Sequence, residues 1–212
     1  MISIQVAEHP YLEAGAVGIE LPAAQGEESP PWLQEMLLPE FPCEPMTDEC
    51  KKAVRTLLRH GGYRPAGRGK PSSEWLQKAA AEGKLGSIYP LVDLGNASSR
   101  QAGLPLSVVD LDRVEGELSI DLAPEGQSYV FNKSGQEIDL GGLICLSDRL
   151  GPCANAVKDS QRTKTAPQTS RCLILVWGTR ELPGAAERLV GDIQQSAQRL
   201  GGRLERVEFL PR

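Results

Sequence analysis

Two acidic residues each follow a β-branched, apolar segment, and a polar stretch separates them in the chain. Leu91–Asp93 and Val108–Asp110 end in the carboxylates, and Asn96, Ser98 and Ser99 lie between them. A pair of carboxylates can carry out acid–base chemistry when their surroundings drive their pKa values apart. Asp and Asn at the start of a helix also commonly cap its free N–H groups, so a structural role for these residues stays open.

A second polar segment, Lys158–Thr165, precedes the most apolar run of the chain. It mixes cations with hydroxyl groups, and such a segment can hold a phosphate or a carboxylate because Arg binds these groups in a bidentate manner. The alternative is a solvated loop. With three further cations it forms the main concentration of positive charge, a candidate RNA-binding patch of Arg64, Arg68, Lys70, Lys158, Arg162 and Lys164.

The remaining residue types exclude several kinds of site. The chain has only two histidines, His9 and His60, far apart in sequence, and its five cysteines form no C-x-x-C pair. We therefore expect neither a metal nor a cofactor. No G-x-S-x-G, P-loop or G-x-G-x-x-G pattern is present, so spacing alone names no reaction. The net charge of −5 argues against phosphate binding over the whole surface.

Helices are expected where apolar residues recur every three or four positions between capping and breaking residues. Thr47 should cap one helix, and Ser72 or Ser73 should cap the next. Pro90 should begin an extended segment, with a short helix resuming over 96–102. A C-terminal helix should begin near Pro183 and end at Gly201-Gly202.

Alternating and fully apolar runs predict the strands. Segment 23–46, rich in Pro and Glu, should be a surface loop with one short helix over 32–38, and the runs from 117 to 146 should form a β-meander. Cys172–Trp177 is typical of a strand buried on both faces. The other expected strands are Ile2–Val6, Ala16–Leu21 and Arg203–Leu210.

These elements predict an α+β fold with a mixed β core, barrel-like or layered, and flanking helices. We expect one domain over residues 1–212, with strands and a surface loop in 1–50 and a helix plus strand in 183–212. No apolar run approaches the roughly 18 residues that span a bilayer, and the N-terminus lacks the pattern of a secretory signal. A cytoplasmic protein with reduced cysteines and no membrane partner is therefore expected.

The ordered spacing Val92-Asp93-x-x-Asn96, then Gly103-x-Pro105 and Asp110-x-Asp112, resembles a known family. It is similar to the B3/B4 editing domain of the phenylalanyl-tRNA synthetase β subunit, and more closely to freestanding B3/B4 proteins. The segments 71–76 and 159–165 also match the freestanding branch, and the similarity covers about residues 55–180.

The resemblance implies a B3/B4-like fold with a pocket that hydrolyses the ester of mischarged tRNA, without a metal. It implies no ability to charge tRNA. Asp93 and Asn96 match the family's Asp and Asn, whereas Tyr89 stands where the synthetase domain usually has Arg, and Gly95 where it has a hydroxyl residue. Ser107 occupies the position of a His held to place water or substrate.

Arg162, or Thr163 beside it, stands near the position at which the synthetase domain has the Glu that selects tyrosine. The resemblance therefore implies that the charges of the synthetase pocket are not conserved in this chain. Arg162 could stabilise an oxyanion, while Ser107 with Ser160 or Thr163 could position water or the α-amino group. The candidate substrate-binding residues are Tyr89, Asp93, Asn96, Ser107, Ser160, Arg162 and Thr163.

Three functions remain open from the sequence. The first is trans-editing hydrolysis of mischarged aminoacyl-tRNA. The second is a non-catalytic module that binds RNA or a free amino acid, and the third is small-molecule binding or hydrolysis unrelated to tRNA. All three require the loop over 93–107 and the run near 160 to line opposite sides of one concave cavity.

Overall fold

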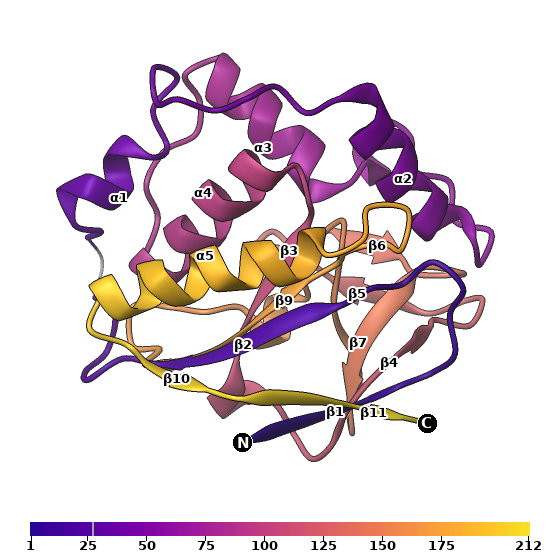
Figure 1. Cartoon of the computed structure of the whole chain (residues 1–212). Coiled ribbons are helices and arrows are strands. Elements are labelled where there is room, and N and C mark those ends of the chain that lie inside the picture. The colour runs from indigo at the N-terminus through magenta and orange to yellow at the C-terminus, as the bar shows by residue number, and fades with distance from the viewer. Residues whose placement is uncertain (27) are drawn as a thin grey trace.

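Strand β9 lies at the centre of the fold, and both of its faces are buried. The computed structural model describes residues 1–26 and 28–212, and Figure 1 shows β9 between β2 and β3. The three pair antiparallel. The four-stranded sheet runs in the order β10 (Arg203–Glu205), β2 (Gly15–Glu20), β9 (Arg171–Val176) and β3 (Leu106–Asp110).

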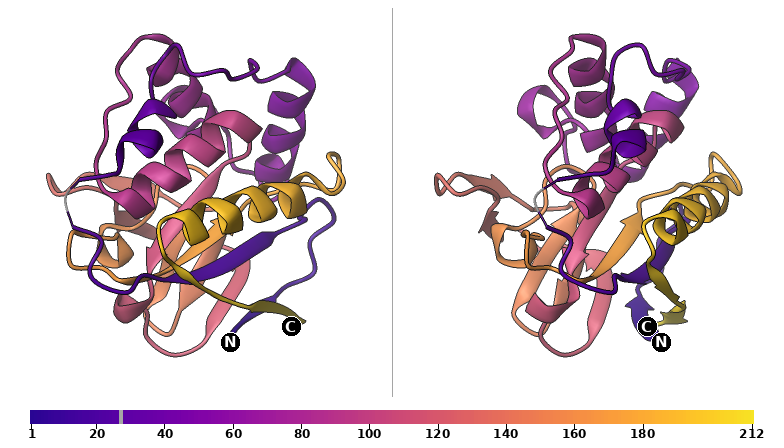
Figure 2. Two further views of the ribbon diagram at one scale, coloured as in Figure 1. Left: turned by 60° about the vertical axis from the view of Figure 1, so that its left-hand side comes forward. Right: turned by 90° about the vertical axis from the view of Figure 1, so that its left-hand side faces the viewer.

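A second sheet packs against one face of the first. Its strand β1 pairs parallel with both neighbours, and the remaining pairs are antiparallel. A separate hairpin extends from the body in the right-hand view of Figure 2, formed by β5 (Ser128–Val130) and β6 (Glu137–Asp139). The five strands, in order, are β11 (Val207–Pro211), β1 (Ile2–Val6), β4 (Leu118–Leu122), β7 (Ile144–Asp148) and β8 (Gly151–Asn155).

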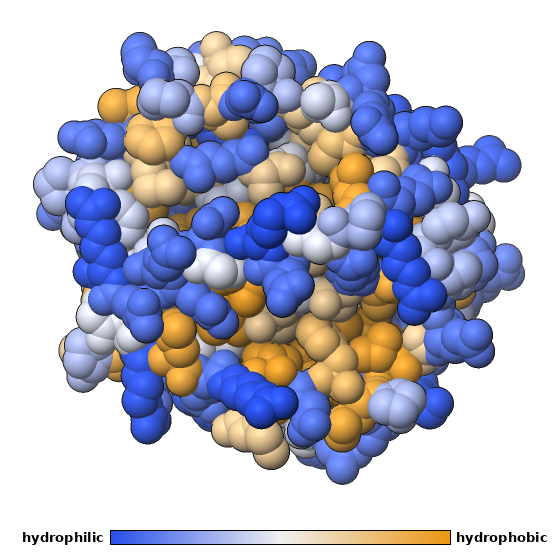
Figure 3. All heavy atoms as spheres, in the orientation of Figure 1, coloured by the Kyte–Doolittle hydropathy of each residue, from blue (hydrophilic) through white to orange (hydrophobic). Residues whose placement is uncertain are grey.

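Helices cover the other face of the four-stranded sheet. In the space-filling view, hydrophilic side chains form a band at the height of α5, and apolar side chains are visible below it (Figure 3). Three short 3-10 helices span 67–69, 111–113 and 161–163. The α-helices are α1 (Pro31–Glu35), α2 (Asp48–Arg59), α3 (Ser72–Ala81), α4 (Pro90–Ala102) and α5 (Ala185–Arg199).

Two apolar cores meet at β9. Leu173 and Leu175 face the core between the two sheets, whereas Ile174 and Val176 face the core beneath the helices. Successive side chains of a strand point to opposite faces, so one apolar run serves both cores. The mixed α+β fold with layered sheets and flanking helices is thus confirmed.

Several predicted boundaries differ from those of the structure. Helix α4 begins at Pro90, not near residue 96, because Pro is favoured at the first helical position and the buried face of the helix packs on β3. Pro71 occupies the N-cap of α3, and the hydroxyls of Ser72 and Ser73 are buried without a partner among the described residues.

The predicted C-terminal strand is two strands in different sheets, β10 and β11, since the chain crosses between sheets at Arg206. Strand β1 and the Thr47 cap are confirmed: the Thr47 hydroxyl accepts a hydrogen bond from the Cys50 N–H at 3.1 Å. The meander is interrupted by the β5–β6 hairpin. Within the predicted loop 23–46, Glu27 lies outside the described residues.

No helix in residues 1–26 or 28–212 combines the length and the apolar character that crossing a bilayer requires.

Candidate functional site

A cavity of about 950 Å³ lies between helices α3 and α4 on one side and the segment 157–168 on the other. One wall is largely apolar and carries the exposed indole of Trp75 and the side chain of Ile88. Tyr89 and Asn96 add a phenol and an amide from the start and middle of α4. The two segments that the sequence analysis singled out therefore do line one cavity, which meets the spatial requirement of all three functions.

Asp159 is held in the wall of the cavity by hydrogen bonds from Ser107, Asn155 and the Val108 N–H. Its Oδ1 accepts from the Ser107 hydroxyl at 2.7 Å and from the Asn155 N–H at 3.2 Å. The Ser107 hydroxyl in turn accepts from the indole N–H of Trp177 at 2.9 Å. Ser107 and Trp177 are fully buried, so this chain of bonds holds the half-buried carboxyl group in place.

Burial raises the pKa of Asp159 to about 6, because a charged carboxylate is poorly solvated there. The hydrogen bonds from Ser107 and from the N–H groups of Asn155 and Val108 oppose this shift, as does the positive charge of Lys164. Burial also lowers the pKa of Lys164, with Asp159 acting against it, and lowers that of Lys158, aided by Arg68. Perturbed titratable groups of this kind cluster at functional sites.

Basic residues line the same cavity as Asp159. The Lys158 ammonium lies 4.0 Å from the centre of the Phe131 ring, and the Lys164 ammonium donates to the Phe131 carbonyl. The Tyr129 hydroxyl donates to the Lys158 carbonyl at 2.5 Å, so the β5–β6 hairpin is fastened to the cavity wall. The basic residues that line the cavity are Arg68, Arg113, Lys133, Lys158 and Lys164.

The structure brings together several of the predicted site residues. Tyr89 and Asn96 line the cavity directly, as do three members of the predicted basic patch, Arg68, Lys158 and Lys164. Ser107 is buried beneath the cavity surface and donates a hydrogen bond to Asp159, which lines the cavity.

Asp93 does not line the cavity and has the structural role that the sequence analysis left open. Its buried carboxylate accepts from the hydroxyls of Ser29 and Ser87, at 2.6 and 2.5 Å, and from the Ile88 N–H at 2.8 Å. Asp93 therefore holds the segment before α4 and the Ser29 loop against the first turn of the helix. Asp110 lies in a separate cluster, where it accepts from the hydroxyl of Thr169 at 2.6 Å. The two carboxylates of the opening pattern thus hold the backbone in two different places.

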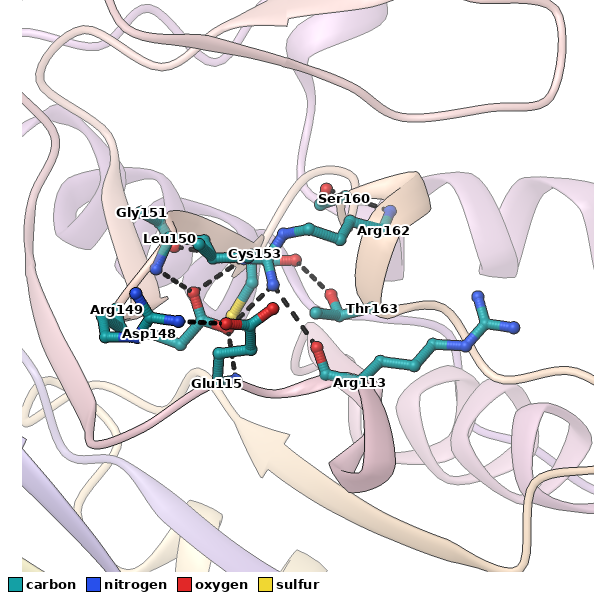
Figure 4. Close-up of polar contacts among 10 residues, drawn as sticks. All are labelled: Arg113, Glu115, Asp148, Arg149, Leu150, Gly151, Cys153, Ser160, Arg162 and Thr163. Carbon is teal, nitrogen blue, oxygen red and sulfur yellow. Dashed lines mark hydrogen bonds and ion pairs between the residues drawn. The ribbon is translucent and has the colours of Figure 1, made fainter.

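Arg162, Ser160 and Thr163 hold the 3-10 helix that follows Asp159 rather than lining the cavity. Arg162 makes two hydrogen bonds to Asp148, both at 2.8 Å (Figure 4). The Thr163 hydroxyl donates to the Cys153 carbonyl at 3.0 Å, and the Ser160 hydroxyl accepts from the Arg162 N–H.

Two further members of the predicted patch also lie apart. Arg64 lines a separate, smaller cavity, and Lys70 follows the 3-10 helix at 67–69 outside the main cavity lining. The sequence analysis did not place Asp159, Trp75, Arg113 or Lys133 in the site. A signal for Asp159 existed, since it is the single acid in the run from 158 to 164, which holds three cations.

Comparison with known proteins supports the expected family. A model of the B3/4 domain matches residues 64–182, more than half of the chain. The chain belongs to the B3/4 domain family. The match includes α3, α4, β3 and the segment 157–168, so every wall of the cavity falls within the B3/4 region.

Relatives of this B3/4 chain include phenylalanine–tRNA ligase β subunits. That of Bartonella quintana (strain Toulouse) is 28% identical over 141 residues, covering 60% of this chain and 16% of that protein. That of Neisseria meningitidis serogroup B is 30% identical over 95 residues, covering 41% and 12%. The chain thus spans a small part of the length of these curated relatives.

The fold is also found in a solved structure. An N-terminal fragment of the phenylalanyl-tRNA synthetase β subunit from Pyrococcus horikoshii matches with a TM-score of 0.58 at 9% identity. The match covers 100% of this chain and 52% of that one. At this identity the likeness concerns the fold, and the chemistry must be argued from the cavity itself.

Proposed function

We propose that this B3/4 chain hydrolyses the ester bond of mischarged aminoacyl-tRNA in trans. The observation that carries the proposal is the cavity, which combines an apolar wall, one carboxyl group and a rim of cations. The terminus of an aminoacyl-tRNA carries phosphates, a nucleobase and an amino acid. Rim cations suit the phosphates, and the exposed indole of Trp75 offers a surface on which a base can stack.

The chemical demand on the site is modest. An aminoacyl ester is already activated, so holding a water molecule against the carbonyl carbon and stabilising the oxyanion are sufficient. Water adds to the carbonyl, the C–O bond to the ribose breaks, and the free amino acid and the tRNA hydroxyl leave. The Asn96 amide and the Lys164 ammonium are the cavity groups suited to the oxyanion, while Arg162 holds the adjoining 3-10 helix in place.

The test is a panel of tRNAs charged with correct and incorrect amino acids, including tyrosine on the phenylalanine tRNA. We expect the protein to accelerate deacylation of at least one mischarged member, and the corresponding correctly charged tRNA to be spared. Lys133→Ala, on the rim, should weaken the reaction, whereas Lys52→Ala, on α2, is the matched control. A panel that shows no acceleration would refute the proposal.

A second function, binding of tRNA or a free amino acid without chemistry, is favoured by one observation. Among the described residues that line the cavity there is neither a histidine nor a cysteine, so the commonest general base and the most nucleophilic side chain are absent there. Gel-shift assays with uncharged tRNA at low and moderate salt address this alternative. Salt-sensitive binding without any deacylation would favour the binding module over the hydrolase.

A further inference from the structure

Asp159 stands out electrostatically within the cavity. It is the one carboxylate among the lining residues in the described part of the chain, and five cations share that lining. In residues 1–26 and 28–212 no ion pair within 4.0 Å involves Asp159. The nearby Lys164 directs its ammonium to the Phe131 carbonyl instead.

Asp159 accepts from the Ser107 hydroxyl and from the N–H groups of Asn155 and Val108, and a carboxylate with about four acceptor positions still has capacity for a ligand. Ser107 and Asn155 both donate to Oδ1, so Oδ2 accepts neither of these bonds. The position is determined by buried groups, because Ser107 is fully buried and is itself bonded to Trp177. The positive charge of Lys164 favours the charged form of Asp159 without making an ion pair within 4.0 Å, so a cationic ligand can still pair with the carboxylate.

An aminoacyl ester carries one positive group, its α-ammonium, beside an otherwise negative nucleic-acid terminus. The cavity presents the complementary arrangement, with one carboxylate among cations. We infer that Asp159 binds the α-ammonium of the aminoacyl group, so that the site selects esters with a free amino group over N-acylated, peptidyl-type esters. This inference rests on the proposed function and names the chemistry by which the same cavity recognises its substrate.

The acidity of the two groups is consistent with such a pair. The pKa of Asp159 is raised to about 6 by burial, and an approaching ammonium favours the charged carboxylate. An α-ammonium loses its proton with a pKa of about 8. Recognition should therefore be strongest between about pH 6 and 8 and weaken on both sides.

The experiment measures binding, so its outcome does not depend on catalysis. The probes are 3′-aminoacylamino-3′-deoxyadenosines carrying tyrosine, serine or alanine, whose amide link resists hydrolysis, and their N-acetylated forms. We expect the wild type to bind at least one free-amine probe tenfold or more tightly than its acetylated form, a difference of about 1.4 kcal/mol. Asp159→Asn should bind both forms equally, and Glu137→Gln, which removes an exposed carboxylate of β6, should keep the preference.

Three results would overturn the inference. These are no measurable binding of any free-amine probe by the wild type, equal binding of both forms by the wild type, or an undiminished preference in a folded Asp159→Asn variant. The comparison of the two probes on wild-type protein needs no variant, so it stands even if Asp159→Asn fails to fold. A free-amine preference in a protein that deacylates nothing would support the inference while the proposed hydrolysis fails.

A kinetic readout separates recognition from a role in activating water. With N-acetylated mischarged tRNA as substrate, Asp159→Asn should have no further effect, because the contact it removes is already absent. A fall in kcat of the same size for free and acetylated substrates would assign Asp159 to water activation and would refute ammonium recognition.

Discussion

The ion pair between Arg162 and Asp148 should hold the segment after Asp159 against the end of β7, and Arg162→Met tests this. Met keeps an apolar stem and removes the charge. Asp148 has a side chain that is 0% exposed, and it would keep only the N–H bonds from Glu115 and Leu150, each 2.9 Å long. Figure 4 shows these partners around the carboxylate.

The size of the effect follows from this geometry. Removing one partner of a buried ion pair typically destabilises a protein by about 3–5 kcal/mol. Because the Arg162 side chain is 31% exposed and Asp148 retains two hydrogen bonds, we expect a smaller loss. A value of about 2–3 kcal/mol corresponds, for a domain of this size, to a fall in Tm of about 5–10 °C.

The loss should depend on pH in a defined direction. Burial would raise the pKa of Asp148, but the hydrogen bonds from Arg162 and from the Glu115 and Leu150 N–H groups lower it overall. A lowered pKa in the folded state contributes stability above the unfolded value of about 3.9, and that stability is lost as the pH falls below it. The difference between wild type and Arg162→Met should therefore narrow below about pH 4.

Urea unfolding of the wild type, Arg162→Met, Asp148→Asn and the double variant measures the pair directly. The coupling free energy between the two substitutions should exceed 1 kcal/mol in magnitude, as an order-of-magnitude expectation for contacting charges. At 25 °C the folded Arg162→Met variant should still bind the adenosine probes. If Arg162→Met lowers stability by less than about 0.5 kcal/mol, the structural role is refuted. If Arg162→Met abolishes probe binding at unchanged stability, Arg162 takes part in binding.

Three further predictions concern the cavity. Gly95→Ala would place a Cβ 2.6 Å from the Val108 Cγ2, so urea unfolding should show a loss of stability of about 1–3 kcal/mol, and an unchanged stability would contradict the close packing of α4 on β3. Since the pKa of Asp159 in the folded state is raised to about 6, the free energy of unfolding of the wild type should fall as the pH rises from 4 to 6. Asp159→Asn should remove this fall and be more stable than the wild type by up to about 2 kcal/mol at pH 7. Parallel curves of unfolding free energy against pH for the two proteins would contradict this prediction. If tRNA is bound, Lys133→Ala and Lys158→Ala should each reduce the slope of log K against log salt by about 0.7, measured by fluorescence anisotropy, and an unchanged slope would exclude contact with phosphate.

The sequence by itself determined those features that depend on neighbouring residues. The run 172–177 is apolar at every position, which specifies a strand buried on both faces wherever it lies. Thr47 caps α2 through a bond to a residue three positions away, and the ordered Asp, Asn, Gly and Pro spacing identified the B3/4 family. Such signals depend on residues close together in the chain or on their order, so they can be recognised without a structure.

The tertiary structure alone decided which polar groups meet. Arg162 and Asp159 stand three residues apart in one polar run, yet the first pairs with Asp148 and the second turns to the cavity. The same holds for Asp93, whose hydroxyl partner Ser29 comes from a loop 64 residues earlier. A side chain's role is determined by the low-dielectric surroundings and hydrogen-bond partners that folding brings to it, and those come from distant positions that no local pattern encodes.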